Sequence, residues 1–179
     1  ASTTIEFEPD LSLFHGISSL DEVQEVLCKR VLDVAGTCGG LNVSLNGEKL
    51  PIKGFKQYCE YYAKSMGVTT PVSYVHTNDR WEIALCASPN GESRDVSFVN
   101  HISTEDGGTH VRSVRIAVES DLLERMEKKF KANIPSSKVR NNLMVFVNSM
   151  IENPSFGSQT KVKNRKSTRL NSSHEDISR

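Results

Sequence analysis

The stretch LMVFV at residues 143–147 is apolar at every position. Such a run is typical of a strand that is covered on both faces, so we predict a central strand here. Pro154 follows this strand, and SFGSQTK at residues 155–161 predicts a loop. Upstream, Gly107-Gly108 predicts a loop that leads into a helix over about residues 110–131. The C-terminal half therefore reads as helix, central strand and loop.

Three further strands are predicted before that helix. Apolar and polar side chains alternate at residues 72–76, 81–85 and 96–98. Turn residues separate these runs, first Asn78-Asp79 and then Pro89-Asn90-Gly91. Their close spacing predicts an antiparallel meander. Because helices accompany this sheet, the predicted fold class is α+β.

The N-terminal part begins with a predicted strand and a long helix. Residues 3–7 alternate and predict the strand. Ser19 and Glu22 form a capping box, which predicts a helix through Ala35 that Gly36 stops. Apolar residues recur along this helix at helical spacing and are expected to face the core. They are Val23, Val26, Leu27, Val31 and Val34.

A hairpin and a short helix are predicted next. Asn46-Gly47 lies between two alternating stretches and is the strongest short signal for a β-hairpin. Residues 55–63 predict a short helix that carries three tyrosines. Gly67 and Pro71 then indicate a linker, so we expect a domain boundary near residue 65.

The composition of the 179-residue chain fits one domain or two small pieces. Apolar residues make up 37% and charged residues 25%, which excludes wholesale disorder. Basic and acidic residues number 22 each, which excludes a generally basic nucleic-acid binder but leaves a local basic patch open. Residues 1–120 hold 10 basic and 16 acidic residues, and residues 121–179 hold 12 basic and 6 acidic ones.

No membrane association and no metal site are expected. The apolar runs are too short for a transmembrane helix, and ASTTIEFEPD lacks the features of a secretory signal. Neither the five histidines nor the cysteines show metal-ligand spacing, and no phosphate-binding loop or hydrolase motif is present. The cysteines are therefore expected to be reduced thiols; they are Cys28, Cys38, Cys59 and Cys86.

Two segments resemble the transducer region of eukaryotic DNA topoisomerase II, and gyrase B has counterparts of both. They are SFVNHISTEDGGTH at residues 97–110 and FVNSMIENPSFGSQTK at residues 146–161. The stretches EFEPDLSLF, LDVAG, VSLNGEKLPIKGF and DRWEIAL are also similar to the eukaryotic enzyme. The resemblance implies the C-terminal part of a GHKL-type ATPase domain at residues 1–65. It further implies a partial transducer domain of left-handed β-α-β, ribosomal-protein-like fold at residues 66–161.

The resemblance also implies roles for the Gln-Thr-Lys loop, which in this family extends into the ATP site. Gln159, Thr160 and Lys161 occupy the matching positions. Lys161 is expected to contact the γ-phosphate as a catalytic residue, while Gln159 helps to hold the loop against it. Taken without the family, a lysine in such a loop is typical of a solvated surface charge. His110 matches the wall behind the ATP gate and is expected to take no chemical step.

A basic run at the end of the predicted helix 110–131 has two interpretations. Lys128, Lys129 and Lys131 are typical of a solvated helix end. In eukaryotic topoisomerase II the matching helix carries a lysine-rich loop that faces double-stranded DNA. If they contact DNA here, the contacts are to phosphates and strongly salt-dependent.

The implied parent enzyme is an ATP-hydrolysing, magnesium-dependent homodimer of the nucleus that passes one DNA duplex through another. The ATP-binding motifs with the catalytic glutamate and the magnesium ligands are expected to lie outside this fragment, which alone is predicted inactive. Residues 162–179 do not resemble the family and are expected to be a non-native or disordered tail. The alternative is a non-catalytic nucleic-acid-binding module that has the transducer fold.

Overall fold

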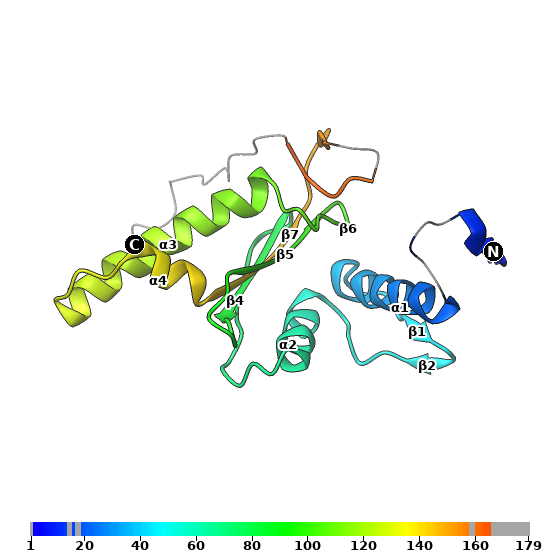
Figure 1. Ribbon diagram of the computed structural model, residues 1–179, viewed down its shortest axis with the longest axis horizontal. Coiled ribbons are helices and arrows are strands. Elements are labelled where there is room, and N and C mark those ends of the chain that lie inside the picture. The colour runs from blue at the N-terminus through cyan, green and yellow to red at the C-terminus, as the bar shows by residue number, and fades with distance from the viewer. Residues whose placement is uncertain (1, 14–15, 17–18, 158–159, 166–179) are drawn as a thin grey trace.

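The computed structural model describes residues 2–13, 16, 19–157 and 160–165. Figure 1 shows helices on both sides of the main sheet, with a further helix and a small hairpin beside it. The helices are η1 (Leu11–Leu13), α1 (Leu20–Thr37), α2 (Phe55–Ser65), α3 (Thr109–Phe130) and α4 (Ser136–Asn141). The strands are β1 (Ser44–Leu45), β2 (Glu48–Lys49), β3 (Ser73–Asn78), β4 (Trp81–Ala87), β5 (Arg94–Val99), β6 (Ile102–Ser103) and β7 (Leu143–Ser149).

The predicted central strand is confirmed, because all seven residues of β7 are buried. The main sheet has the order β3-β4-β7-β5-β6. β7 pairs antiparallel with β4 and parallel with β5, so that Val147 lies opposite Ile83 on one side and Ser97 on the other. The fold class is α+β, as predicted.

The predicted antiparallel meander is wrong beyond its first pair. β3 and β4 are antiparallel neighbours, but β4 and β5 are separated by β7. The segment after β5 passes through α3 and α4 and returns as the parallel strand β7, which forms a β-α-β unit. The most apolar strand gains most from burial on both faces and takes the centre of the sheet.

The alternating side chains of β7 build a core on each face of the sheet. Met144 and Phe146 pack in the cluster that contains Phe55 and Tyr58 of α2. Val145 and Val147 belong to the cluster on the other face with residues of α3. Because successive strand residues point to opposite faces, one apolar strand connects both layers. The helix predicted at 55–63 is confirmed as α2 and extends two residues further.

The strand predicted at residues 3–7 is not formed. Ile5 is 83% exposed and Phe7 65% exposed, and none of the described strands pairs with this segment. An alternating pattern becomes a strand only when another strand supplies backbone hydrogen bonds. Residues 3–7 thus have the alternating pattern of a strand, but none of the described strands pairs with them.

Helix α1 follows Ser19 as predicted, but its C-terminal end and its core face differ. Ser19 makes no side-chain cap hydrogen bond, and the helix continues through Gly36 to Thr37. Gly36 is buried against α2, where a Cβ atom would lie 2.5 Å from the Tyr58 Cβ. The predicted core face is only partly covered, since Val26 is 68% exposed and Leu27 47% exposed.

The N-terminal elements are joined to the sheet by polar contacts as well as by the α2 core. The buried Asp33 accepts hydrogen bonds from Tyr58 Oη at 2.8 Å and from Lys29 Nζ at 2.9 Å. His101 Nδ1 lies 3.0 Å from the carbonyl oxygen of Thr37, and Arg30 Nη1 donates to the His101 carbonyl at 3.1 Å. Contacts thus cross the position at which the domain boundary was predicted.

The Asn46-Gly47 turn and the helix 110–131 are confirmed, with Asn46 and Gly47 both at positive φ. The sequence analysis missed three short elements, η1, β6 and α4. All four cysteines are free, as expected.

In the part of the chain described, no helix has the length and apolar character needed to cross a membrane.

Candidate functional site

The loop that carries Lys161 is closed at its base. Arg165 N donates to the Ser155 carbonyl at 2.7 Å, and Gly157 N donates to the Lys163 carbonyl at 2.9 Å. Lys161 itself is exposed and has a positive φ of 59°, which is uncommon for a residue with a side chain. The backbone therefore presents Lys161 near the tip of a loop whose two ends are fixed to each other.

The structure describes two of the three predicted nucleotide-binding residues. Thr160 and Lys161 are both exposed, and the Lys161 ammonium lies 5.8 Å from the centre of the Phe156 ring. No ion pair to a described carboxylate neutralises Lys161. Gln159 lies outside the described residues. The arrangement offers a positive charge on a short, closed loop.

A second set of backbone hydrogen bonds anchors this loop to the start of α3. Asp106 N donates to the Val162 carbonyl at 2.9 Å, and Asn164 N donates to the Gly107 carbonyl at 3.2 Å. Thr109 N, in the first turn of α3, donates to the Asn164 carbonyl at 3.2 Å. Residues 162–165 were assigned to the tail in the sequence analysis, but these bonds make them part of the fold. We call residues 162–165 together with 106–109 the anchor.

The anchor explains why glycine occurs at residue 108. A Cβ atom there would lie 2.4 Å from the Asn164 oxygen and 2.9 Å from the Asn164 nitrogen. Gly107 has a φ of 67°, which supplies the backbone freedom expected of this loop. The sequence analysis gave the glycines that freedom but missed the close approach to Asn164. A Gly-Gly pair is the only local signal for it, since the two segments are far apart in the chain.

Behind the anchor lies a buried cluster of three polar side chains. Thr104 Oγ1 lies 2.7 Å from Ser97 Oγ and 3.2 Å from His110 Nε2. His110 is fully buried, and burial lowers its pKa to about 4. The imidazole is therefore neutral at pH 7 and acts in the packing of α3 against β5.

The candidate DNA-binding lysines lie at the opposite end of α3 from the anchor. Lys128 and Lys129 are in the last helical turn, and Lys131 is the C-cap with a φ of 49°. The 22 residues of α3 correspond to a length of about 30 Å. Lys128 Nζ lies 2.5 Å from Glu124 Oε1, and Lys129 Nζ lies 5.5 Å from the centre of the Phe130 ring. The two predicted sites are therefore not brought together.

A chain of ion pairs fixes α3 between β5 and α4. Arg115 contacts Asp95 of β5, and its Nη1 lies 3.6 Å from Glu119 Oε1. Glu119 Oε2 in turn accepts a hydrogen bond from Arg140 Nη2 of α4 at 3.0 Å. The Arg115 and Glu119 side chains are only 11% and 7% exposed. These side chains hold the helix that joins the two candidate sites.

Cations and metal-binding groups are distributed unevenly around the anchor. A cavity of about 410 Å³ beside it is lined by four basic residues and two acidic ones, none of which the sequence analysis singled out; they are Arg112, Arg115, Lys163, Arg165, Asp95 and Asp106. Within residues 2–165, apart from the gaps given above, no group of three or more His, Cys, Asp or Glu residues is arranged to hold a metal ion. The anchor region thus presents positive charge without a cluster of metal ligands.

Comparisons with known proteins relate these features to one family. The family model for DNA gyrase B matches residues 54–173. The chain is 41% identical over 177 residues to DNA topoisomerase 2 of Meyerozyma guilliermondii, covering 89% of this chain and 13% of that protein. It is 43% identical over 166 residues to DNA topoisomerase 2-beta of Gallus gallus, covering 89% of this chain and 10% of that protein. The chain thus spans about a tenth of the length of these relatives.

Solved structures agree with the sequence comparisons. The ATPase region of Saccharomyces cerevisiae topoisomerase II superposes with a TM-score of 0.76 at 37% identity, covering 88% of this chain and 40% of that one. The ATPase and transducer domains of Balamuthia mandrillaris topoisomerase II give the same TM-score, identity and coverage. Sequence and fold lead to one assignment. The chain belongs to the type II DNA topoisomerase family and corresponds to part of its ATPase and transducer region.

Proposed function

We propose that this chain couples ATP binding and hydrolysis to movement of the DNA gate in a type II topoisomerase. In this proposal residues 1–65 are the C-terminal part of the GHKL ATPase domain, and residues 66–161 are most of the transducer. Lys161 contacts the γ-phosphate of ATP, and Gln159 and Thr160 hold the loop around it. The magnesium ligands and the catalytic glutamate are supplied by another part of the enzyme.

The observation that carries the proposal is the anchor between the Lys161 loop and the start of α3. Asn164 bonds through its backbone to both Gly107 and Thr109, so a displacement of the loop is transmitted to α3. The exposed Lys161 ammonium is a point charge that can follow a departing phosphate. The family membership supports a nucleotide as the source of that phosphate.

The exposed apolar face of α1 supports the assignment of residues 1–65. Leu20, Val26 and Leu27 are 59%, 68% and 47% exposed although they recur at helical spacing. Side chains in such a pattern are usually buried against another element. In the proposed enzyme this face packs against the remainder of the ATPase domain.

The Lys161→Ala substitution in the intact enzyme tests the nucleotide role. A charge-assisted contact contributes about 1.5–3 kcal/mol, which corresponds to roughly a 10- to 150-fold loss of ATP turnover if it is made mainly in the transition state. DNA strand passage, measured as decatenation, should fall with it. Lys64→Ala is the matched control, because Lys64 is an exposed lysine of α2 that belongs neither to the loop nor to the anchor. Wild-type ATP turnover by the Lys161 variant would exclude the proposed role.

The proposed enzyme is a nuclear homodimer that uses ATP and magnesium to pass one DNA duplex through another. The 179-residue chain by itself should neither hydrolyse ATP nor cleave DNA. An ATPase assay on the isolated chain, with the intact enzyme as the positive control, tests this part of the proposal. Turnover by the isolated chain would show that it contains a complete catalytic site.

The exposed basic end of α3 favours a second candidate function, a non-catalytic module that binds nucleic acid. Lys128, Lys129 and Lys131 are all exposed there. This alternative predicts salt-sensitive binding of duplex DNA by the 179-residue chain without any nucleotide. Absence of binding at low salt would exclude it, while leaving the role of Lys161 untouched.

A further inference from the structure

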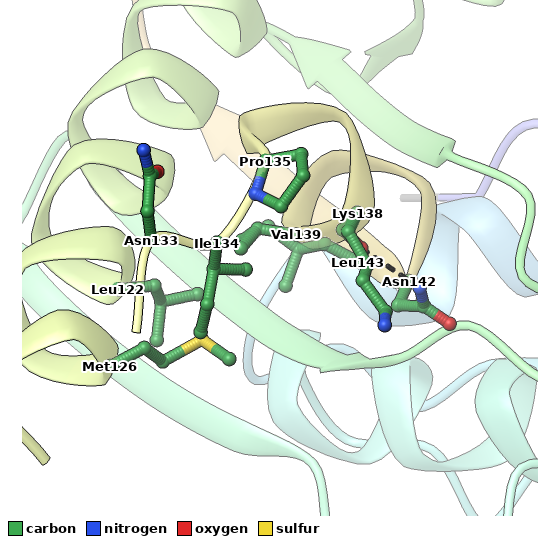
Figure 2. A pocket seen from close by; sticks show the side chains of 9 residues that line it. All are labelled: Leu122, Met126, Asn133, Ile134, Pro135, Lys138, Val139, Asn142 and Leu143. Atoms are coloured by element: carbon green, nitrogen blue, oxygen red, sulfur yellow. Dashed lines mark hydrogen bonds between the residues drawn. The ribbon is translucent and has the colours of Figure 1, made fainter. Parts of the chain in front are cut away.

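A cavity of about 570 Å³ lies away from the Lys161 loop, at the other end of the α3–α4 layer. Its walls are the second half of α3, residues 133–135, α4 and the first residue of β7. Figure 2 shows the Ile134 side chain extending toward Met126, which comes from the same helix as Leu122. Val139 of α4 is buried beneath this opening. The lining is thus mainly apolar.

Three polar side chains complete the lining, and only one of them is charged. They are Asn133, Lys138 and Asn142. Lys138 is exposed and forms no ion pair with any carboxylate in the described part of the chain. No acidic residue lines the cavity. The cavity therefore combines an apolar body with a single uncompensated positive charge.

The cavity has firmly held walls. Arg140 of α4 donates two hydrogen bonds to Glu119 Oε2 of α3, at 3.2 and 3.0 Å. Asn142 Nδ2 donates to the Lys138 carbonyl at 2.8 Å, which closes the last turn of α4 (Figure 2). The Arg140–Glu119 bonds thus join α4 to α3, the two helices that line the cavity.

We propose that this cavity binds a small amphiphilic anion, with a ring system or short alkyl body among the apolar side chains and a carboxylate or sulfonate on Lys138. The volume is within the roughly 300–1,000 Å³ typical of pockets for small ligands, which are mostly apolar with a few fixed polar groups. Lys138 selects a negative head group, since no carboxylate competes for it. The amides of Asn133 and Asn142 offer further hydrogen bonds at the rim.

Two probes with the same ring system distinguish the contribution of the charge to binding from that of the apolar contacts. Anilinonaphthalene sulfonate carries the anionic group, and N-phenylnaphthylamine lacks it. Each is titrated into the 179-residue chain labelled at the methyl groups of Ile, Val, Leu and Met. Saturable shifts of the Ile134, Met126 and Val139 methyl resonances are expected. The exposed Val26 and Leu27 methyl groups on α1 report non-specific binding in the same spectra.

Lys138→Met should weaken binding of the sulfonate probe about fivefold, as expected for the loss of a partly solvated ion pair. The affinity for the neutral probe should not change. Lys131→Met is the matched control and should change neither probe, because Lys131 does not line the cavity. Ile134→Trp fills the cavity and should abolish binding of both. Because Lys138 is exposed, its variant is informative even if the tryptophan variant is poorly folded. Shifts confined to Val26 and Leu27, or an unchanged sulfonate affinity in Lys138→Met, would overturn the proposal.

Discussion

Gly108 and Asn164 are in direct backbone contact although 56 positions separate them in the chain. A Cβ atom on residue 108 would lie 2.4 Å from the Asn164 oxygen, which is closer than real side chains approach. This contact lies in the centre of the anchor that connects the Lys161 loop to α3. Glycine at residue 108 thus permits the close backbone approach that joins the Lys161 loop to the start of α3.

The Gly108→Ala substitution should destabilise the chain and loosen the anchor. The added methyl group meets backbone atoms that cannot rotate away, and we expect a loss of about 1–3 kcal/mol in the free energy of unfolding. Chemical denaturation measures this loss, and hydrogen exchange of residues 162–165 should accelerate. Gly39→Ala is the control, because among the described residues nothing beyond its chain neighbours lies within 4 Å of its added Cβ. Equal stability of the two variants would show that the anchor is not tightly packed.

The free energy of unfolding should decrease as the pH is lowered, because of His110. Its folded-state pKa of about 4 lies below its ordinary value of 6.5. A lowered pKa means that the stabilising contribution is complete above pH 6.5 and is lost as the pH falls toward 4. At about 1.36 kcal/mol per unit, the full loss is about 3 kcal/mol. Denaturation curves recorded between these pH values give the free energy of unfolding at each pH. This free energy should change more strongly with pH for wild type than for His110→Gln.

The matched control for this pH dependence is His76→Gln, since His76 is exposed on β3. It should retain the wild-type dependence of the free energy of unfolding on pH. Parallel pH profiles for wild type and His110→Gln would mean that the imidazole becomes protonated without cost in the folded chain. The Thr104 hydrogen bond would then have to be rearranged.

Removal of Glu119 should be costly because it leaves the nearly buried Arg115 with one carboxylate partner fewer. Breaking a buried ion pair on one side typically costs about 3–5 kcal/mol, and the remaining contact with Asp95 should keep the loss for Glu119→Ala near the lower figure. Glu124→Ala on the same helix is the control. Its carboxylate is 65% exposed and pairs with Lys128, so the change should stay within about 0.5 kcal/mol. Thermal unfolding of both variants compares them directly, and similar losses would contradict the ion-pair account.

Neutralisation of the basic end of α3 should weaken DNA binding without affecting sequence preference. In the variant, Lys128, Lys129 and Lys131 are all changed to glutamine. The negative slope of log K against log salt should become less steep by up to about 2.7, since each phosphate contact contributes about 0.9. Fluorescence anisotropy with duplex DNA at several salt concentrations measures the slope. A variant with Lys49, Lys53 and Lys56 changed to glutamine removes the same charge elsewhere. An equal decrease in both variants would indicate a general charge effect.

Local sequence signals predicted most individual elements correctly. Asn46-Gly47 specifies a tight turn because both residues tolerate positive φ, and β1 and β2 form around it. The apolar run at 143–147 predicted a doubly covered strand, which β7 is. These properties depend on neighbouring residues in the chain or on burial alone, so they can be recognised without knowledge of the fold.

The candidate site was predicted only in part, and only through the family resemblance. Nothing in the local sequence around Lys161 distinguishes it from a surface lysine. The anchor residues 162–165 were assigned to a tail because residues 162–179 do not resemble the family. Their order comes from backbone hydrogen bonds to residues 106–109, and backbone groups are the same in every sequence.

The sequence by itself determined which segments are apolar, where tight turns form and how long the main helices are, since these follow from side-chain burial and local backbone preference. Only the tertiary structure decided that β7 lies between β4 and β5, that residues 3–7 lack a strand partner, and that Gly108 meets Asn164. An alternating or apolar pattern specifies that a strand is buried but not which strand pairs with it. That choice depends on contacts between distant segments, because their free energy arises only when the whole sheet is assembled.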